Sequence, residues 1–260
     1  MKGLLIDLTR CIGCRACQVA CKQWNSLSAE KTGFFKGKGY ENPGRLSSRT
    51  WTVIKFNDIK GSVGYDWVFS KRQCFHCIKP SCVSVCPVSA LNRSKSGAVL
   101  YNSSRCLGCR YCQMACPFNI PCFDWDKAIP EIRKCTLCVD RTDAGMEPAC
   151  SKTCPTDAIV FGDRDDLIKN AEKRIIQNPA QYVNHIYGRH EVGGTGVLYL
   201  SSVPFEKLGF RIDLPKTPIA EKSRIAMESI PYLMTGLGTI LGFLAWIINR
   251  RIENEKRDSD

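Results

Sequence analysis

The chain has 260 residues and a formal net charge of +12, and its 17 cysteines are the unusual feature of its composition. The length allows one large domain or two small ones, each with room for a hydrophobic core. Most of the cysteines fall into tight groups rather than being spread along the chain, which excludes the disulfide framework of a small secreted domain. The N-terminus lacks the apolar region and the cleavage site of a secretory signal, so we expect no signal peptide.

A predicted short strand, "GLLIDL", leads directly into the first cysteine group. In that group the cysteines are separated by two, two and three residues. The four groups are Cys11, Cys14, Cys17, Cys21; Cys74, Cys77, Cys82, Cys86; Cys106, Cys109, Cys112, Cys116; and Cys135, Cys138, Cys150, Cys154. Proline follows the last cysteine of the second, third and fourth groups, whereas Lys22 follows that of the first.

Between and after the groups, the patterns predict strands and one surface helix. "RTWTVIKFND" (49–58) and "YDWVFSKRQ" (65–73) alternate β-branched and aromatic residues and predict a hairpin around "IKGSVG". "AVLYN" and "AIVFG" predict short strands. Residues 164–177 have apolar positions at helical spacing. "GGTGVLYLSSVPFEKLGF" (193–210) lacks the strand–GxGxxG–helix context of a dinucleotide site, so a turn followed by a packed strand is expected.

The C-terminal region contains a long uncharged segment. Residues 229–249 carry no charge over 21 positions, which is enough to cross the hydrocarbon core of a bilayer. Tyr232 and Trp246 lie near its ends, where aromatic belts occur, and Gly238 and Gly242 would let another helix approach closely. The segment predicts a transmembrane helix rather than a buried core helix. Four basic residues precede it and four follow it, which leaves its orientation open: they are Arg211, Lys216, Lys222, Arg224 and Arg250, Arg251, Lys256, Arg257. The later four are closer together, which leans towards a cytoplasmic C-terminus.

The cysteine spacing indicates iron–sulfur clusters. Zinc is the competing metal, but zinc sites pair two Cys-x-x-Cys knuckles across a longer loop. The run of two, two and three is the spacing of bacterial ferredoxins, in which three thiolates bind one [4Fe–4S] cube and the fourth ligates the neighbouring cube. Four such groups predict four [4Fe–4S] clusters held by all sixteen cysteines.

The exchange of fourth cysteines predicts which groups pair. The second and third groups are close in sequence, so the first and fourth pair around them as a nested unit. The predicted ligand sets are Cys11, Cys14, Cys17 with Cys154; Cys135, Cys138, Cys150 with Cys21; Cys74, Cys77, Cys82 with Cys116; and Cys106, Cys109, Cys112 with Cys86. Pairing of the first group with the second remains open, although it leaves residues 22–73 as a long loop inside a small module.

The clusters also change how the charge is interpreted. Each oxidised cube with four thiolates carries about −2, so four contribute roughly −8 and the loaded protein is only mildly basic. Nucleic-acid binding, the usual inference from a basic chain, therefore loses most of its support. Arginines beside the motifs, such as Arg10, Arg15, Arg105 and Arg110, are expected to raise cluster potentials because reduction adds negative charge.

Four further residues could bind metal but are interpreted otherwise. Cys122 has no partner at ligand spacing, so a buried or half-buried free thiol is expected. His76, between two cysteines, is expected to pack or to hydrogen-bond near a cluster. His185 and His190, in "HIYGRH", are interpreted as residues of a solvated loop rather than haem ligands.

Several segments resemble the iron–sulfur β subunit of membrane-bound respiratory formate dehydrogenase. They are "CIGCRACQVACKQWN", "PGRLSSRTWTVIKF", "CPFNIPCF", "KCTLCVDRTDAGMEPAC" and "CPTDAI". The cysteine frame is shared with the iron–sulfur subunits of other molybdopterin oxidoreductases. "GGTGVLYLSSVPFEKLGF" is also similar to the membrane-anchored iron–sulfur subunit of uptake hydrogenases, which is the alternative assignment.

The resemblance implies a fold, partners and a location. The fold is α+β, with two nested ferredoxin-like units and one C-terminal transmembrane helix. The implied divisions are an outer unit (1–72 and 134–163), an inserted unit (73–133), an extension contacting the body and partner subunits (164–228), the helix (229–249) and a polar tail (250–260). The implied partners are a molybdenum- or tungsten-pterin catalytic subunit and a membrane cytochrome b with its quinone site. The implied location is the inner membrane, with the clusters on the periplasmic side and the C-terminus in the cytoplasm.

The resulting hypothesis is a non-catalytic electron carrier within an oxidoreductase complex. Fully thiolate-ligated cubes leave no open metal position, and the motifs include no nucleophile or acid–base pair. Two other classes of protein remain as alternatives: a soluble polyferredoxin-like carrier, which the apolar C-terminus disfavours, and a zinc-rich structural or nucleic-acid-binding protein, which the cysteine spacing disfavours.

Overall fold

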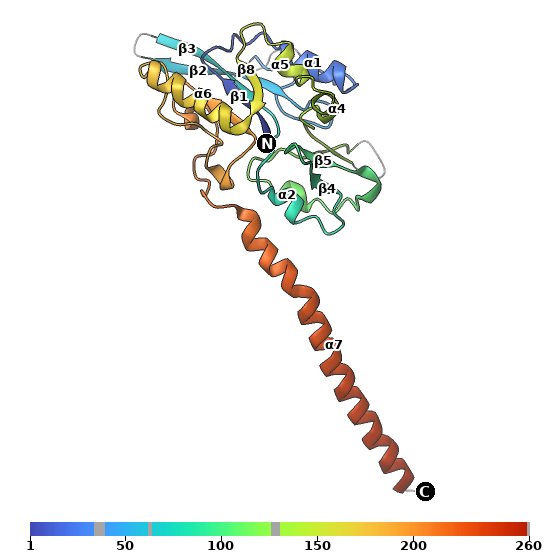
Figure 1. Ribbon diagram of the computed structural model, residues 1–260. Helices are drawn as coiled ribbons and strands as arrows, with labels where there is room; N and C mark the ends of the chain where they lie inside the picture. Colours follow the sequence, from blue (N-terminus) through green and yellow to red (C-terminus); the bar gives the residue numbers. More distant parts are fainter. Residues whose placement is uncertain (34–39, 62–63, 126–130, 259–260) are drawn as a thin grey trace. The chain divides into compact units, whose positions relative to one another are not determined.

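The computed structural model describes residues 1–33, 40–61, 64–125 and 131–258 (Figure 1). The chain divides into two compact units, Met1–Ile219 and Ala220–Asp260. The first unit contains all 17 cysteines among mixed helices and strands, and the second is helical. This composition agrees with the predicted α+β class and C-terminal helix. The finer division of the first unit into outer, inserted and extension segments stays a prediction.

The main sheet of the first unit has three strands. β1 (Lys2–Asp7) lies in the centre, antiparallel to β8 (Ile159–Asp163) and parallel to β9 (Val197–Leu200). Leu4 is opposite Phe161 on one side and Val197 on the other. The three strands correspond to "GLLIDL", "AIVFG" and the strand expected after the glycine cluster, so all three predictions are confirmed.

Helix α6 (Arg164–Gln177) covers one face of this sheet, and its bounds match the predicted helix. Its buried residues Leu167 and Ala171 pack with Leu5, Leu198 and Leu200. Side chains alternate between the faces of a strand, so the neighbours of Leu5 in β1 point to the opposite side. There they join the larger core, which includes several of the cysteines.

That larger core contains a cluster of aromatic side chains. Phe75, directly after the first cysteine of the second group, stacks on Phe118 with ring centroids 4.0 Å apart. Tyr187 and Tyr199 are fully buried and contact Phe210 at centroid distances of 4.9 and 5.0 Å. The segment after α6 thus packs on the cysteine-bearing body, as expected for residues 193–210.

The predicted hairpin is present as β2 (Val53–Gly61) and β3 (Gly64–Arg72). Its register pairs Val53 with Arg72 and Ile54 with Lys71. Residues 62–63, at the predicted turn, lie outside the described residues. The end of the hairpin away from the turn is buried, with Val53, Ile54 and Lys71 each 1% exposed.

The remaining elements are short and surround the cysteine motifs. The helices are α1 (Ala16–Trp24), α2 (Ser81–Ser84), α3 (Tyr111–Met114), α4 (Val139–Asp143) and α5 (Ala149–Lys152). The strands are β4 (Leu91–Arg93), β5 (Val99–Tyr101), β6 (Cys122–Phe123) and β7 (Ile132–Arg133), which form two small hairpins. The 3₁₀ turns are η1 (Ser103–Arg105), η2 (Glu191–Gly193) and η3 (Phe205–Leu208). The predicted strand "AVLYN" corresponds to β5.

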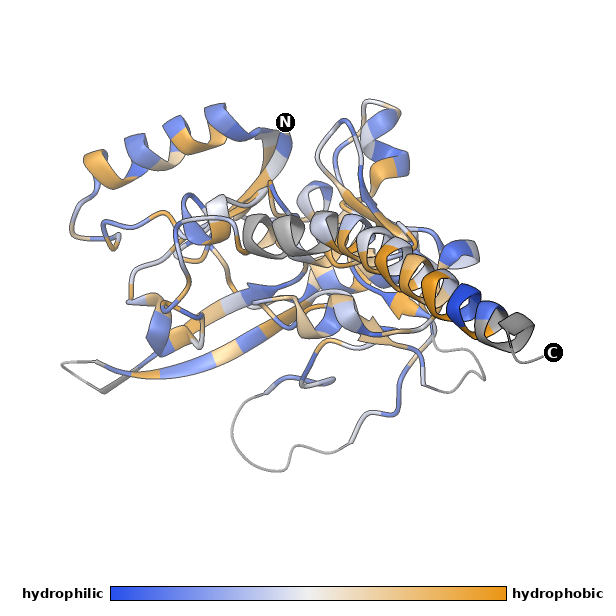
Figure 2. Ribbon diagram, turned by 90° about the horizontal axis from the view of Figure 1, so that it is seen from below, coloured by the Kyte–Doolittle hydropathy of each residue, from blue (hydrophilic) through white to orange (hydrophobic). Residues whose placement is uncertain are grey.

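The second unit consists of one helix, α7 (Ile219–Asp258). The segment Ser229–Ile252 is long and apolar enough to cross a membrane, and none of it is buried within the structure. Figure 2 shows its hydrophobic middle followed by a hydrophilic stretch toward the C-terminus. Exposed Leu, Ile and Phe side chains in water would be costly, so the helix fits a membrane anchor.

Candidate iron–sulfur sites

The first Cys-x-x-Cys loop of each group has a left-handed residue before its second cysteine. The four residues and their φ angles are Gly13 (69°), His76 (47°), Gly108 (70°) and Leu137 (58°). This conformation turns the backbone N–H of the residue back toward the first cysteine of the loop. The N–H of Gly108 donates to Cys106 Sγ at 3.4 Å, and that of Leu137 donates to Cys135 Sγ at 3.3 Å. Such donors stabilise negative charge on a ligating sulfur.

Proline accounts for a difference between the first group and the others. In the other three groups, a four-residue helix (α2, α3 or α5) ends three residues before Pro87, Pro117 or Pro155. Proline cannot continue a helix because it lacks an N–H and its ring clashes with the preceding turn. In the first group, Lys22 takes the equivalent position, and α1 continues for nine residues to Trp24.

The helices bring the cysteine groups together in pairs. α1 packs against α5 and α2 against α3, so the first group meets the fourth and the second meets the third. One cavity is lined by four cysteines here called quartet 1: Cys11, Cys14, Cys17 and Cys154. A second cavity is lined by quartet 2: Cys21, Cys135, Cys138 and Cys150.

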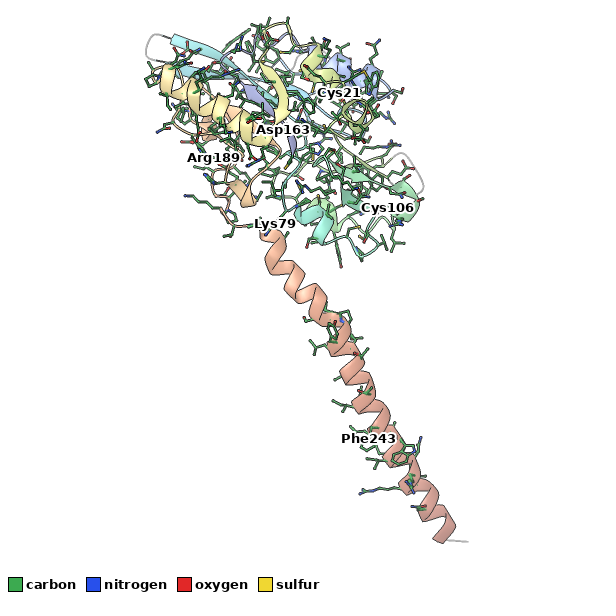
Figure 3. The ribbon with its side chains drawn as sticks, in the orientation of Figure 1. Cys21, Lys79, Cys106, Asp163, Arg189 and Phe243 are labelled. Atoms are coloured by element: carbon green, nitrogen blue, oxygen red, sulfur yellow. The ribbon has the colours of Figure 1, made fainter. Side chains whose placement is uncertain are left out.

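The second and third groups form two further sets. The Cys77 thiol interacts electrostatically with the other members of quartet 3: Cys74, Cys82 and Cys116. The Cys112 thiol interacts with the other members of quartet 4: Cys86, Cys106 and Cys109. Figure 3 shows Cys21 beside α1 and α5, and Cys106 in the part of the unit that holds β4 and β5. The four sets have the same members as the four predicted ligand sets.

Burial determines the protonation of several thiols. It raises the pKa of Cys17, Cys21, Cys82 and Cys112 to about 12. These thiols therefore keep their protons at neutral pH until a metal displaces them. Binding of a cluster would exchange protons for iron, which offsets the cost of placing thiolates in an apolar site.

Lys71 borders both quartet 1 and quartet 2. It lines both cavities and is 1% exposed. Burial lowers its pKa, but negative charge on the nearby sulfurs of Cys150 and Cys17 more than offsets burial, and the pKa lies above its ordinary value. A buried ammonium needs negative charge close by, and an anionic cluster in each cavity would supply it.

Two neutral donors share the wall of quartet 2 with Lys71. Thr52 Oγ1 and Gln73 Nε2 are buried and, like Lys71 Nζ, have no hydrogen-bond partner among the described residues. Buried polar groups are nearly always paired. A sulfide-rich anion in the cavity would accept from all three donors, so these residues fit an iron–sulfur cluster.

His76 connects quartet 2 with the motif of quartet 3. Its ring is fully buried, which lowers its pKa well below the ordinary value and keeps it neutral. Nδ1 accepts a hydrogen bond from the N–H of Val99 at 3.0 Å, so the proton lies on Nε2. Nε2 is 3.5 Å from Cys135 Sγ and donates to it. The prediction that His76 hydrogen-bonds near a cluster site is confirmed.

The other singled-out residues lie apart from the quartets. Cys122 is half-buried in β6, and its thiol donates to the Ile120 carbonyl at 3.4 Å, as expected for a free thiol. His185 and His190 are themselves exposed, on either side of the buried residues 186–188, and His185 Nε2 lies 2.7 Å from Glu191 Oε1. Within the described ranges, no three His, Cys, Asp or Glu side chains lie at the spacing that a single bound metal ion requires.

Sequence reasoning missed three residues of the sites: Thr52, Lys71 and Gln73. Their segments were interpreted as strands only. The available signal was the polar run "SKRQ" directly before Cys74, at the end of a strand that is otherwise apolar and aromatic.

Comparison with known proteins agrees with this geometry. A 4Fe–4S dicluster domain model matches residues 65–164, and a 4Fe–4S binding domain model matches residues 2–23. These matches confirm the ferredoxin-like fold and iron–sulfur clusters as the cofactor.

Three relatives cover nearly the whole chain. A protein of Nitratidesulfovibrio vulgaris is 42% identical over 96% of this chain and 67% of its own length. The iron–sulfur subunit of the nitrate-inducible formate dehydrogenase of Escherichia coli K12 is 37% identical over 98% of this chain and 88% of its own length. The hydrogenase-2 operon protein HybA of Escherichia coli O157:H7 is 34% identical over 98% of this chain and 86% of its own length. The chain therefore belongs to the family of non-catalytic 4Fe–4S electron-transfer subunits that includes the iron–sulfur subunits of formate dehydrogenases.

Proposed function

We propose that this chain relays electrons through four [4Fe–4S] clusters between a formate-oxidising catalytic subunit and a membrane quinone site. The main support is the gathering of sixteen cysteines into four quartets, each combining three cysteines of one motif with one of another. The proposed ligands are the members of the four quartets. Quartets 1 and 2 belong to the outer unit (1–72 and 134–163), and quartets 3 and 4 to the inserted unit (73–133).

The contacts between quartets suggest a linear route. Quartets 1 and 2 share Lys71 in their walls. Quartet 2 approaches quartet 3 through His76 and Cys135, and Cys135 interacts electrostatically with Cys74. Quartet 3 approaches quartet 4 through Cys82 and Cys112. One electron at a time would pass along this order, with no bond made or broken. The bound clusters supply the redox chemistry, and the protein residues set distance, hydration and charge around them.

The two ends of the route carry the exposed ligands. Cys14 in quartet 1 and Cys109 in quartet 4 are exposed, unlike the other proposed ligands. Each is preceded by an exposed apolar side chain, with Ile12 58% and Leu107 71% exposed. Exposed apolar side chains favour partner surfaces. We propose that a molybdenum- or tungsten-pterin catalytic subunit covers one end and a cytochrome b subunit the other.

The proposed location follows from α7. The helix would cross the inner membrane, with the clusters on the periplasmic side and the tail in the cytoplasm. Its support is the basic cluster that follows the uncharged segment 229–249, which is Arg250, Arg251, Lys256 and Arg257. The similarity to HybA over 98% of this chain favours a second candidate function, the iron–sulfur subunit of a membrane-bound uptake hydrogenase.

The test uses the native complex, extracted in detergent through a tag on this chain. We expect formate, and not hydrogen, to bleach the visible absorbance of the clusters, and about sixteen irons per chain. Bleaching by hydrogen alone would transfer the chain to the hydrogenase group. Cys138→Ser is expected to remove about four irons. The matched control Cys122→Ser, outside the quartets, is expected to remove none.

A further inference from the structure

We infer that Thr52, Lys71 and Gln73, here called the donor triad, make quartet 2 the higher-potential site of the pair formed by quartets 1 and 2. An electron in this half of the chain then rests at quartet 2. The inference rests on the proposed function, because it requires clusters at both quartets. Reduction adds one electron to a site, and the donors stabilise the added negative charge without transferring a proton.

The hairpin directs the triad toward the cysteines. Val53 pairs with Arg72 in the register, so Thr52 and Gln73 stand opposite each other just beyond the last pair. Ile54 pairs with Lys71, two positions further along. Opposed residues and residues two apart share one face of an antiparallel pair. Thr52, Gln73, Ile54 and Lys71 therefore all belong to the face that lines the two cavities.

That face divides between the quartets. Thr52 and Gln73 line the cavity of quartet 2, Ile54 lines that of quartet 1, and Lys71 lines both. Five buried side-chain polar atoms in the described part of the chain lack a hydrogen-bond partner, and the three triad atoms are among them. Burial without a partner is costly, so three such donors on one wall indicate an acceptor in that cavity.

Quartet 2 has further donors to its sulfurs. The N–H of Leu137 and Nε2 of His76 both donate to Cys135 Sγ, at 3.3 and 3.5 Å. Asn25 Nδ2 is 3.8 Å from Cys21 Sγ. Hydrogen bonds to cluster and ligand sulfurs raise the reduction potential. The donor triad therefore adds to a site whose cysteine sulfurs already accept hydrogen bonds.

Quartet 1 has a different wall. Besides Lys71, its cavity is lined mostly by apolar side chains, which are Ile6, Ile12, Ile54, Pro155, Ala158 and Ile159. Its donors are fewer: Thr156 Oγ1 lies 3.8 Å from Cys154 Sγ, and the Gly13 N–H donates to the Cys11 sulfur. Arg15 also borders it, but its guanidinium donates to the Tyr40 carbonyl and lies 4.6 Å over the Phe56 ring. A cavity with fewer hydrogen-bond donors stabilises the extra negative charge of a reduced cluster less. The difference between the two cavity walls therefore gives the site at quartet 2 a higher reduction potential than the site at quartet 1.

The test is a mediated redox titration of the full chain in detergent, monitored by electron paramagnetic resonance and independent of formate. The signals are assigned with Cys14→Ser and Cys138→Ser, each of which removes one site of the pair. We expect quartet 2 to reduce at the higher potential. The double variant Thr52→Val/Gln73→Met should lower the reduced-to-oxidised ratio of quartet 2 at fixed poise by at least tenfold, which is 59 mV, and leave quartet 1 unchanged.

Lys71 provides the complementary test. Lys71→Met should lower the reduction potentials of both quartets, because Lys71 lines both cavities. Lys71→Arg keeps the charge and should keep both potentials, and Lys60→Met, an exposed lysine on the same hairpin, should change neither. The inference is overturned if quartet 1 has the higher reduction potential. It is also overturned if Thr52→Val/Gln73→Met or Lys71→Met, with its iron fully bound, leaves the reduction potential of quartet 2 unchanged. Failure of these variants to bind iron would also overturn it, because the triad would then be needed for insertion of the clusters. Mediators reduce the chain directly, so failure of formate to bleach the complex leaves this test intact.

Discussion

The two halves of the cysteine-bearing unit differ in how much protein structure supports the proposed clusters. Quartets 1 and 2 adjoin a three-stranded sheet, a hairpin of nine-residue strands and the nine-residue α1. Quartets 3 and 4 lie among hairpins whose strands are two or three residues long. Burial of the ligands follows the same division. Cys17, Cys21, Cys138 and Cys150 are buried in the first half, but only Cys74 and Cys112 in the second.

The comparison indicates different roles for the clusters in folding. The first half can bury a hydrophobic core before any metal binds. The second half has too little regular structure and core to stand alone, so its clusters would provide much of its stability, as structural metals do in small domains. Three predictions test this difference, in order of decreasing effect.

The largest effect is expected from losing one buried ligand in each half. Cys17→Ser and Cys112→Ser change equivalent cysteines, the third of their groups, and both are buried. Each variant should lose about four irons. Only Cys112→Ser should make residues 73–133 sensitive to protease, because that half loses its main support. Limited proteolysis with mass spectrometry measures this, and equal sensitivity in the two variants would contradict the comparison.

The next effect is expected in the two hydrophobic cores. Leu198 is fully buried between the sheet and α6, and Leu91 is 1% exposed in the small core beside quartet 4. Leu198→Ala should lower the free energy of unfolding by about 2–5 kcal/mol and leave the iron content unchanged. Leu91→Ala should instead appear as loss of iron from quartets 3 and 4. Chemical denaturation and iron analysis distinguish the two, and iron loss in Leu198→Ala alone would reverse the assignment.

The smallest effect is expected at two matched glycines. Gly13 and Gly108 have φ angles of 69° and 70° in equivalent loops. Alanine at either position should cost about 1–2 kcal/mol in the left-handed conformation. At Gly13 the added Cβ would also lie 2.8 Å from the Phe69 ring, whereas at Gly108 nothing lies within 4 Å. Gly13→Ala should therefore destabilise the chain more in thermal unfolding, and equal melting temperatures would show that Phe69 moves aside.

The sequence predicted the local elements well because their signals are local. The hairpin, the helix at 164–177 and the apolar C-terminal helix each follow from periodicity within one segment. The cysteine spacing led to the correct cofactor class, because the ligand geometry of a cube is encoded in consecutive residues.

What the sequence did not reveal depends on contacts between distant segments. The parallel pairing of β1 with β9 joins residues almost 200 positions apart. The hydrophobic pattern within either segment predicts a strand but not its partner. Lys71 resembles the surface lysine of an alternating strand, yet it is buried because the hairpin end inserts between the first and fourth cysteine groups. From the sequence, the arginines beside the motifs were expected to raise the cluster potentials. The guanidinium of Arg15, however, donates to the Tyr40 carbonyl and packs over the Phe56 ring.

The position of β1 at the centre of its sheet has a consequence for biosynthesis. Its two neighbours, β8 and β9, are made only when residues 159–163 and 197–200 leave the ribosome. The first strand to be synthesised therefore cannot pair with β8 until residues 159–163 are made, and it gains its second neighbour only when residues 197–200 follow. Such non-local pairing makes folding slow, and the exposed intermediate is open to aggregation. Scaffolds or chaperones that deliver iron and sulfide would therefore meet quartets 1 and 2, which adjoin this sheet, late in synthesis, whereas the cysteines of quartets 3 and 4 are all present once Cys116 is made.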